Sequence, residues 1–135
     1  MPGRILVAED QLHNMQVIKQ QLADLGKSDL CDFFYNGQEL VLSITKILEA
    51  GQTVDLVLTD FMMPRVNGIQ AVQQIQTYVN AMNLNNEGSV KMPTFVFLTA
   101  HKTAAFSRHA ESLGVATVLE KPATLDQLRS ILDDL

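Results

Sequence analysis

The stretch Asp55-Leu-Val-Leu-Thr-Asp60-Phe-Met-Met-Pro64 places a short apolar run directly before an acidic residue. Residues 5–8, Ile-Leu-Val-Ala, form a second such run, which ends at Glu9 and Asp10. Apolar runs of this length without polar alternation are typical of parallel strands that are covered on both faces of a sheet. We therefore interpret the two runs as the third and first strands of one parallel sheet.

Three more strands and five helices complete the predicted pattern. The strands are expected at residues 31–35, 94–98 and 115–119. The spacing of apolar residues predicts five helices. The first carries the apolar stripe Ile18, Leu22 and Leu25, and the other four are expected at residues 39–50, 69–82, 103–113 and 125–135. The pair Asn36-Gly37 is expected to form a turn and residues 83–92 a polar loop. Five β-then-α units predict a doubly wound α/β sandwich, because parallel strands need right-handed crossovers.

Length and composition limit the classes of protein to which the chain can belong. The chain has 135 residues, which is the size of a single domain spanning residues 1–135. Its net charge of −5 argues against direct nucleic-acid binding. The single cysteine, Cys31, cannot form an internal disulfide and favours a reducing, cytoplasmic location. No apolar run is long enough to insert into a membrane, and no signal-peptide pattern is present.

Charged and hydroxyl side chains follow four of the predicted strands. They are Glu9 and Asp10, Asp60, Thr99 and Lys121. Because ligands bind beyond the carboxyl ends of parallel strands, we expect these side chains to converge at one edge of the sheet. Clustered carboxylates resist joint ionisation, and Mg²⁺ offsets their charge while leaving positions for phosphate oxygens. A carboxylate is also a nucleophile towards phosphorus, which indicates phosphoryl transfer.

The sequence resembles the receiver domain of two-component response regulators. The matching motifs are Leu-Val-Ala-Glu-Asp at 6–10, the stretch 55–64 quoted above, Asn67-Gly68, Phe-Leu-Thr-Ala at 97–100 and Glu-Lys-Pro at 120–122. Asn14, Val17, Leu22, Gly26 and the long loop 83–92 are similar to receivers of hybrid histidine kinases. The resemblance implies a flavodoxin-like sheet with strand order 2-1-3-4-5.

The resemblance also implies a role for each strand-end residue. Asp60 would be the phosphoryl acceptor, and Thr99 and Lys121 would contact the phosphoryl group. Mg²⁺ would be bound by Asp10, Asp60 and the backbone carbonyl of Met62, with Glu9 acting through a metal-bound water. The phosphoryl donor would be a phosphohistidine on a histidine kinase or a histidine phosphotransfer protein. Such a domain is a switch in a phosphorelay, which catalyses its own phosphorylation and slow dephosphorylation and is not a metabolic enzyme.

Two further expectations follow from the same resemblance, and a third from helix spacing. The peptide bond between Lys121 and Pro122 is expected to be cis. Val118 stands where the family often carries a rotating Tyr or Phe, so the usual aromatic half of the switch is absent. On the first helix, Leu12 and Met15 fall off the core stripe and are expected to form a docking patch for the donor; scattered surface hydrophobes are the alternative.

Three other functions compete with this interpretation. A haloacid dehalogenase-like hydrolase would need a second Asp two residues after Asp60, where Met62 stands. A flavin-binding module would need a phosphate loop after the first strand, where Glu9 and Asp10 would repel phosphate. A degenerate receiver used only for interaction would not need the complete set of site residues. The oligomeric state stays open, with a weak homodimer among the alternatives.

Overall fold

The computed structural model describes residues 2–86 and 89–135, and within them five parallel strands form one sheet in the order β2-β1-β3-β4-β5. The strands are β1 (Arg4–Ala8), β2 (Cys31–Phe34), β3 (Val54–Asp60), β4 (Thr94–Thr99) and β5 (Thr117–Glu120). This confirms the predicted strand order and the doubly wound α/β class. The fifth strand begins two residues later than predicted.

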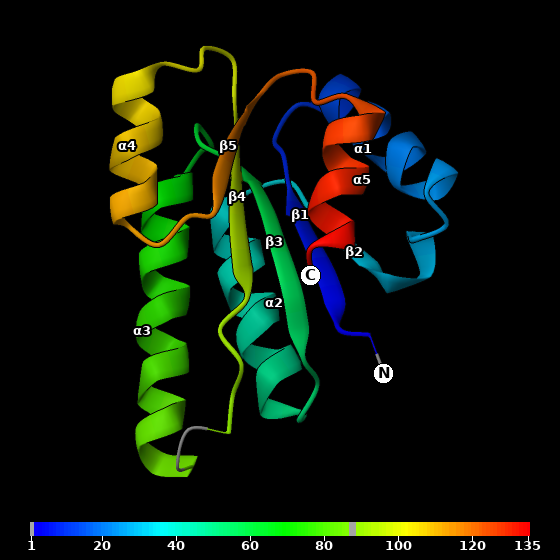
Figure 1. The fold of residues 1–135 in the computed structure, drawn as a ribbon. Helices are drawn as coiled ribbons and strands as arrows, with labels where there is room; N and C mark the ends of the chain where they lie inside the picture. Colours follow the sequence, from blue (N-terminus) through cyan, green and yellow to red (C-terminus); the bar gives the residue numbers. More distant parts are fainter. Residues whose placement is uncertain (1, 87–88) are drawn as a thin grey trace.

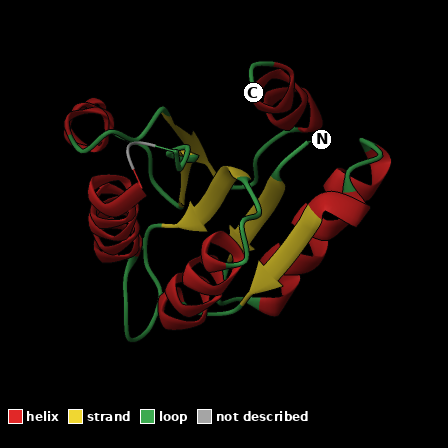
Figure 2. Cartoon of the chain, turned by 90° about the horizontal axis from the view of Figure 1, so that it is seen from below, coloured by secondary structure: helices red, strands yellow, loops and turns green. Residues whose placement is uncertain are grey.

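Helices cover both faces of the sheet (Figures 1 and 2). The helices are α1 (Leu12–Asp24), α2 (Gly37–Glu49), α3 (Gly68–Asn86), α4 (Ala104–Ser112) and α5 (Leu125–Asp133), and a short 3₁₀ helix, Ser28–Leu30, precedes β2. Core residues of α1 and α5 pack together on one face, and those of α2, α3 and α4 pack on the other. Along β1, Ile5 and Val7 point to the first face and Leu6 to the second. Burial on both faces explains the continuous apolar runs.

The Asn36-Gly37 pair begins a helix rather than closing a free turn. The Asn36 side chain accepts a hydrogen bond from the backbone N–H of Glu39 at 2.8 Å, which satisfies one of the free N–H groups at the start of α2. Gly37 is the first residue of that helix, and a Cβ atom there would overlap the backbone carbonyl oxygen of Val66. The N-terminus of α2 therefore lies directly against the segment that follows β3.

The prediction of a loop over residues 83–92 was wrong for its first part, because α3 continues to Asn86. The Asn83 side chain donates a hydrogen bond to the carbonyl of Val90 at 2.9 Å and accepts one from the N–H of Val90 at 2.7 Å. Residues 87–88 lie outside the described residues. A polar composition predicted a loop, but contacts with the returning chain stabilise the last turn of the helix.

The predicted exposure of Met15 was also wrong. Only 1% of Met15 is exposed, and it packs in the core with Ile18 and Leu22. The buried stripe of α1 therefore begins one turn earlier than predicted, and Leu25 is only partly buried at the end of the helix. Leu12, which is 67% exposed, remains as the apolar surface residue of this pair.

None of the helices within residues 2–86 and 89–135 has the length and apolar character needed to cross a membrane.

Candidate functional site

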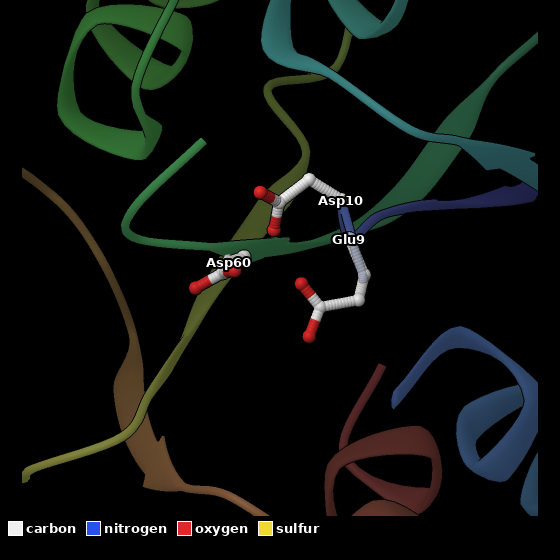
Figure 3. Close-up of side chains that lie close together, drawn as sticks. All are labelled: Glu9, Asp10 and Asp60. Atoms are coloured by element: carbon white, nitrogen blue, oxygen red, sulfur yellow. The ribbon is translucent and has the colours of Figure 1, made fainter. Parts of the chain in front are cut away.

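Three carboxylates meet at the carboxyl edge of the sheet. Glu9 and Asp10 follow β1, and Asp60 is the last residue of β3. The two strands are neighbours, with Ala8 paired to Thr59, so the residues after them lie side by side. One carboxylate oxygen from each of the three residues lies within 4.8 Å of the other two. Figure 3 shows Glu9 and Asp10 leaving the chain in different directions, with Asp60 beside both. The predicted convergence of these three residues is confirmed.

An ammonium group reaches into this cluster from β5, two strands away from β3. Lys121 Nζ lies 2.9 Å from Glu9 Oε1 and 2.8 Å from Asp60 Oδ2. The backbone N–H of Lys121 donates to the Thr99 carbonyl at 2.8 Å, which holds the segment after β5 against the end of β4. The Lys121–Pro122 peptide bond is cis, as predicted. One cation thus bridges two carboxylates that would otherwise face each other unpaired.

Burial strengthens the electrostatic interactions between the charged groups of this cluster. Glu9 is 0% exposed and Asp60 is 3% exposed. Burial and the neighbouring Glu9 carboxylate raise the pKa of Asp60 to about 7, although Lys121 opposes the shift. Burial also acts to raise the pKa of Glu9, but the interactions with Asp60 and with the Lys121 ammonium outweigh burial and lower that pKa. Of the two carboxyl groups, Asp60 is therefore the one that takes up a proton first as the pH falls.

The donor set of the cluster fits a hard divalent cation. Glu9 Oε2 is buried and has no hydrogen-bond partner among the described residues. An unpartnered buried carboxylate oxygen is costly, and a cation or a water bound to one would satisfy it. All three side chains offer only carboxylate oxygens, the ligands that such cations prefer. Glu9, Asp10 and Asp60 can therefore hold a metal ion.

The other two predicted site residues, Met62 and Thr99, lie at the same edge of the sheet. Met62 donates its backbone N–H to Asp60 Oδ1 at 3.2 Å, while its side chain is exposed. Thr99 ends β4, and its hydroxyl oxygen accepts a hydrogen bond from the N–H of His101 at 3.4 Å. The Thr99 hydroxyl thus contacts the segment that follows its own strand. The roles predicted for Met62 and Thr99 stay predictions.

A cavity of about 470 Å³ adjoins the Glu9–Lys121 pair and was not predicted. Asn14 and Val17 of α1 line one side of it, and Pro122 lines another. No sequence signal marks the cavity, because its walls come from α1, from the end of β4 and from the segment after β5. Its position places an open, mostly apolar recess directly beside the acidic cluster.

An aromatic contact joins the cluster to α4. The ring of Phe61, the residue after Asp60, meets the ring of Phe106 edge-on with centroids 4.6 Å apart. Phe97 of β4 lies 6.2 Å from Phe61 and 6.0 Å from Phe106. Val118 is buried in the core on the same face of the sheet. Aromatic rings therefore do connect the Asp60 segment to a helix, although none of them is at position 118.

With this geometry in view, comparison with known proteins decides the family. The response regulator receiver domain family matches residues 5–133. The chain belongs to this family. The resemblance predicted from the five motifs is thereby confirmed.

Relatives of this receiver domain include much longer signalling proteins. Histidine protein kinase 1 of Candida albicans is 30% identical over 97% of the chain, and hybrid signal transduction histidine kinase H of Dictyostelium discoideum is 32% identical over 94%. The chain spans only 5% and 8% of the lengths of these two kinases. The predicted likeness to receivers of hybrid histidine kinases is confirmed.

A solved structure with the same fold is a complex from Saccharomyces cerevisiae. It contains the histidine phosphotransfer signalling protein Ypd1 and the receiver domain of its downstream response regulator Ssk1. The match has a TM-score of 0.79 and 25% identity, and it covers 98% of this chain and 87% of the other.

Proposed function

We propose that this receiver domain, formed by residues 1–135, accepts a phosphoryl group from a phosphohistidine onto Asp60 and switches conformation in a phosphorelay. The observation that carries the proposal is the contact of the buried Asp60 carboxylate with Lys121, beside two further carboxylates. Such a constellation supplies a nucleophile, a cation for phosphoryl oxygens and a metal site at one edge of the sheet.

Each group in the cluster has a separate task in the proposed transfer. An oxygen of Asp60 forms a bond to phosphorus as the bond from phosphorus to the histidine nitrogen breaks, and the donor imidazole leaves. Lys121 and the Thr99 hydroxyl stabilise the negative charge on the transferring oxygens. We propose that Mg²⁺ is held by Asp10, Asp60 and the Met62 carbonyl, with Glu9 acting through a bound water. When bound, it supplies charge neutralisation for the phosphoryl oxygens.

The proposed partner is a histidine kinase or a histidine phosphotransfer protein. Support comes from the Ypd1–Ssk1 complex, in which a receiver with this fold is bound to a phosphotransfer protein. The net charge of −5 favours a protein partner over nucleic acid. The free, buried thiol of Cys31 fits a reducing compartment such as the cytoplasm.

Labelling with acetyl phosphate tests the proposed function. In the presence of Mg²⁺, the protein is expected to gain one phosphate mass in a base-labile form, because an acyl phosphate hydrolyses in base. Asp60→Asn should gain none, and the surface control Asp126→Asn should label like the parent. Intact-mass spectrometry measures the gain. A phosphate on Ser, Thr or His, or labelling that persists in Asp60→Asn, would overturn the assignment, and an unlabelled parent protein would favour the degenerate receiver.

Leu12 is expected to contribute to donor docking. It is exposed on the first turn of α1, two residues from Asp10, on the helix that lines the cavity beside Glu9. Leu12→Ser should slow phosphotransfer from a cognate phosphotransfer protein about tenfold or more, because burying a leucine contributes about 1.5 kcal/mol or more and about 1.4 kcal/mol corresponds to a factor of ten. Acetyl-phosphate labelling needs no docking and should keep its rate.

The matched control is Leu42→Ser, another exposed leucine, which lies on α2. Stopped-flow or quench-flow transfer rates with both donors separate the cases. Equal slowing with both donors would indicate damage to the site, and no slowing with either would place docking elsewhere.

A further inference from the structure

Glu120 ties the segment after β4 to the end of β5. Its Oε1 accepts a hydrogen bond from the backbone N–H of Lys102 at 2.9 Å. Glu120 is the last residue of β5 and pairs with Thr99, the last residue of β4. The carboxylate therefore reaches past its strand partner to the turn that leads into α4. None of the sequence motifs predicted this bond.

The same segment holds the Thr99 hydroxyl. Thr99 Oγ1 accepts from the N–H of His101, the residue just before Lys102. Directly after Lys102, Thr103 caps α4 by accepting a hydrogen bond from the N–H of Phe106 at 3.0 Å. Residues 100–103 are thus a short connection, fastened by side chains at its two ends and by Glu120 in between.

The position of Glu120 on its strand links this hydrogen bond to the packing of α4. Side chains two residues apart on a strand share a face, so Glu120 is on the face of Val118, which packs in the core with α3 and α4. A movement of residues 100–103 away from Glu120 would also shift the start of α4. It would thereby disturb the contact of Phe106 with Phe61, next to Asp60.

We propose that Glu120 is a positioning residue, a latch that holds residues 100–103 where the Thr99 hydroxyl faces His101. This inference rests on the proposed function, in which the Thr99 hydroxyl contacts a phosphoryl group on Asp60. That contact requires the Thr99 O–H, which donates to the His101 carbonyl at 3.5 Å, to turn towards a phosphoryl oxygen instead. The Glu120–Lys102 bond restrains the backbone that moves with it. The latch therefore stabilises the unphosphorylated conformation and lowers the affinity of the site for a phosphoryl group.

Two substitutions at Glu120 distinguish the hydrogen bond to Lys102 from the negative charge of the side chain. Glu120→Ala removes the acceptor, whereas Glu120→Gln keeps an amide oxygen that can accept from Lys102. Glu111→Ala, at an exposed position on α4, is the matched control. In the metal-free protein, amide hydrogen exchange at Lys102 should become about threefold to tenfold faster in Glu120→Ala, the range expected for one partly exposed hydrogen bond. It should stay near the parent rate in the other two variants.

Beryllofluoride, which mimics a phosphoryl group on a carboxylate, tests the consequence in the presence of Mg²⁺. Glu120→Ala should bind it about threefold to tenfold more tightly, because a ligand gains affinity when the competing conformation is destabilised. Glu120→Gln and Glu111→Ala should bind like the parent protein. Isothermal titration calorimetry measures the three affinities against the parent.

Unchanged exchange at Lys102 in Glu120→Ala would overturn the latch itself. Faster exchange with unchanged or weaker beryllofluoride binding would show that the bond does not oppose the switch, and would overturn the proposed role. A parent protein that fails to bind beryllofluoride would contradict the proposed function. The exchange measurement needs no ligand, so the two failures are distinguishable.

Discussion

Replacing Lys121 with Met is expected to lower the free energy of unfolding of the metal-free protein by about 2–4 kcal/mol at neutral pH. Lys121 Nζ contacts both Glu9 and Asp60, and only 18% of the lysine side chain is exposed. Methionine keeps most of the length and apolar contact of lysine but removes the charge. Two buried carboxyl groups would then lack their cation, and removing one partner from a buried ion pair leaves an uncompensated charge. Urea denaturation measures the difference.

Two controls isolate the charge effect of Lys121→Met. Lys46→Met, at an exposed position near the end of α2, should change the free energy of unfolding by less than about 0.5 kcal/mol. In an Asp60→Asn background, Lys121→Met should cost clearly less than in the parent, since one of the two carboxylates is gone. Equal costs in both backgrounds would show that the contact of Lys121 with Asp60 does not contribute to stability.

Asp60→Asn is expected to raise the free energy of unfolding of the metal-free protein, by about 1–3 kcal/mol at pH 8. The pKa of Asp60 is raised to about 7 from an ordinary value of 3.8, mainly by burial and then by Glu9. A raised carboxyl pKa contributes stability that is present below the unfolded value and is lost as pH rises through the folded value. Each pKa unit corresponds to about 1.4 kcal/mol, and the net shift already includes the opposing effect of Lys121. The gain is smaller than the full shift because the amide of asparagine is also a polar group buried at this site.

The pH dependence of this gain is the sharper measurement. The difference between Asp60→Asn and the parent should be near zero at pH 4, grow between pH 4 and about 7, and level off above that range. Thermal or urea unfolding at several pH values measures it. A gain that is constant over this range, or one that is largest at pH 4, would contradict a raised pKa at Asp60.

Mg²⁺ should offset most or all of the greater stability of Asp60→Asn. In the parent, binding to the native state adds about 2.7 kcal/mol at a concentration one hundred times Kd. Asp60→Asn loses one of three carboxylates of the cluster and should respond much less. An equal Mg²⁺ response in the two proteins would place the metal away from Asp60.

The strands and the residues at their ends could be predicted from the sequence because both depend on local pattern. A buried parallel strand must be apolar on both faces, so residues 5–8 and the run before Asp60 stand out without any knowledge of their neighbours. The carboxyl ends of parallel strands meet at one edge of the sheet, so the sequence alone predicted that Glu9, Asp10 and Asp60 lie together. The first turn of α1 was misassigned because the stripe that begins at Met15 and the stripe that ends at Leu25 both fit helical spacing. Only packing against the sheet distinguishes them.

The tertiary structure decided the contacts between residues that are distant in sequence. Three features join segments from different β–α units. They are the contacts of Lys121 with Glu9 and Asp60, the hydrogen bond from the Lys102 N–H to Glu120, and the cavity between α1 and Pro122. The sequence by itself determined which chemical groups stand at the edge of the sheet, because strand periodicity is a property of neighbouring residues. Only the folded structure decided which of those groups touch and which are buried, because distances and burial depend on how the helices pack against both faces of the sheet.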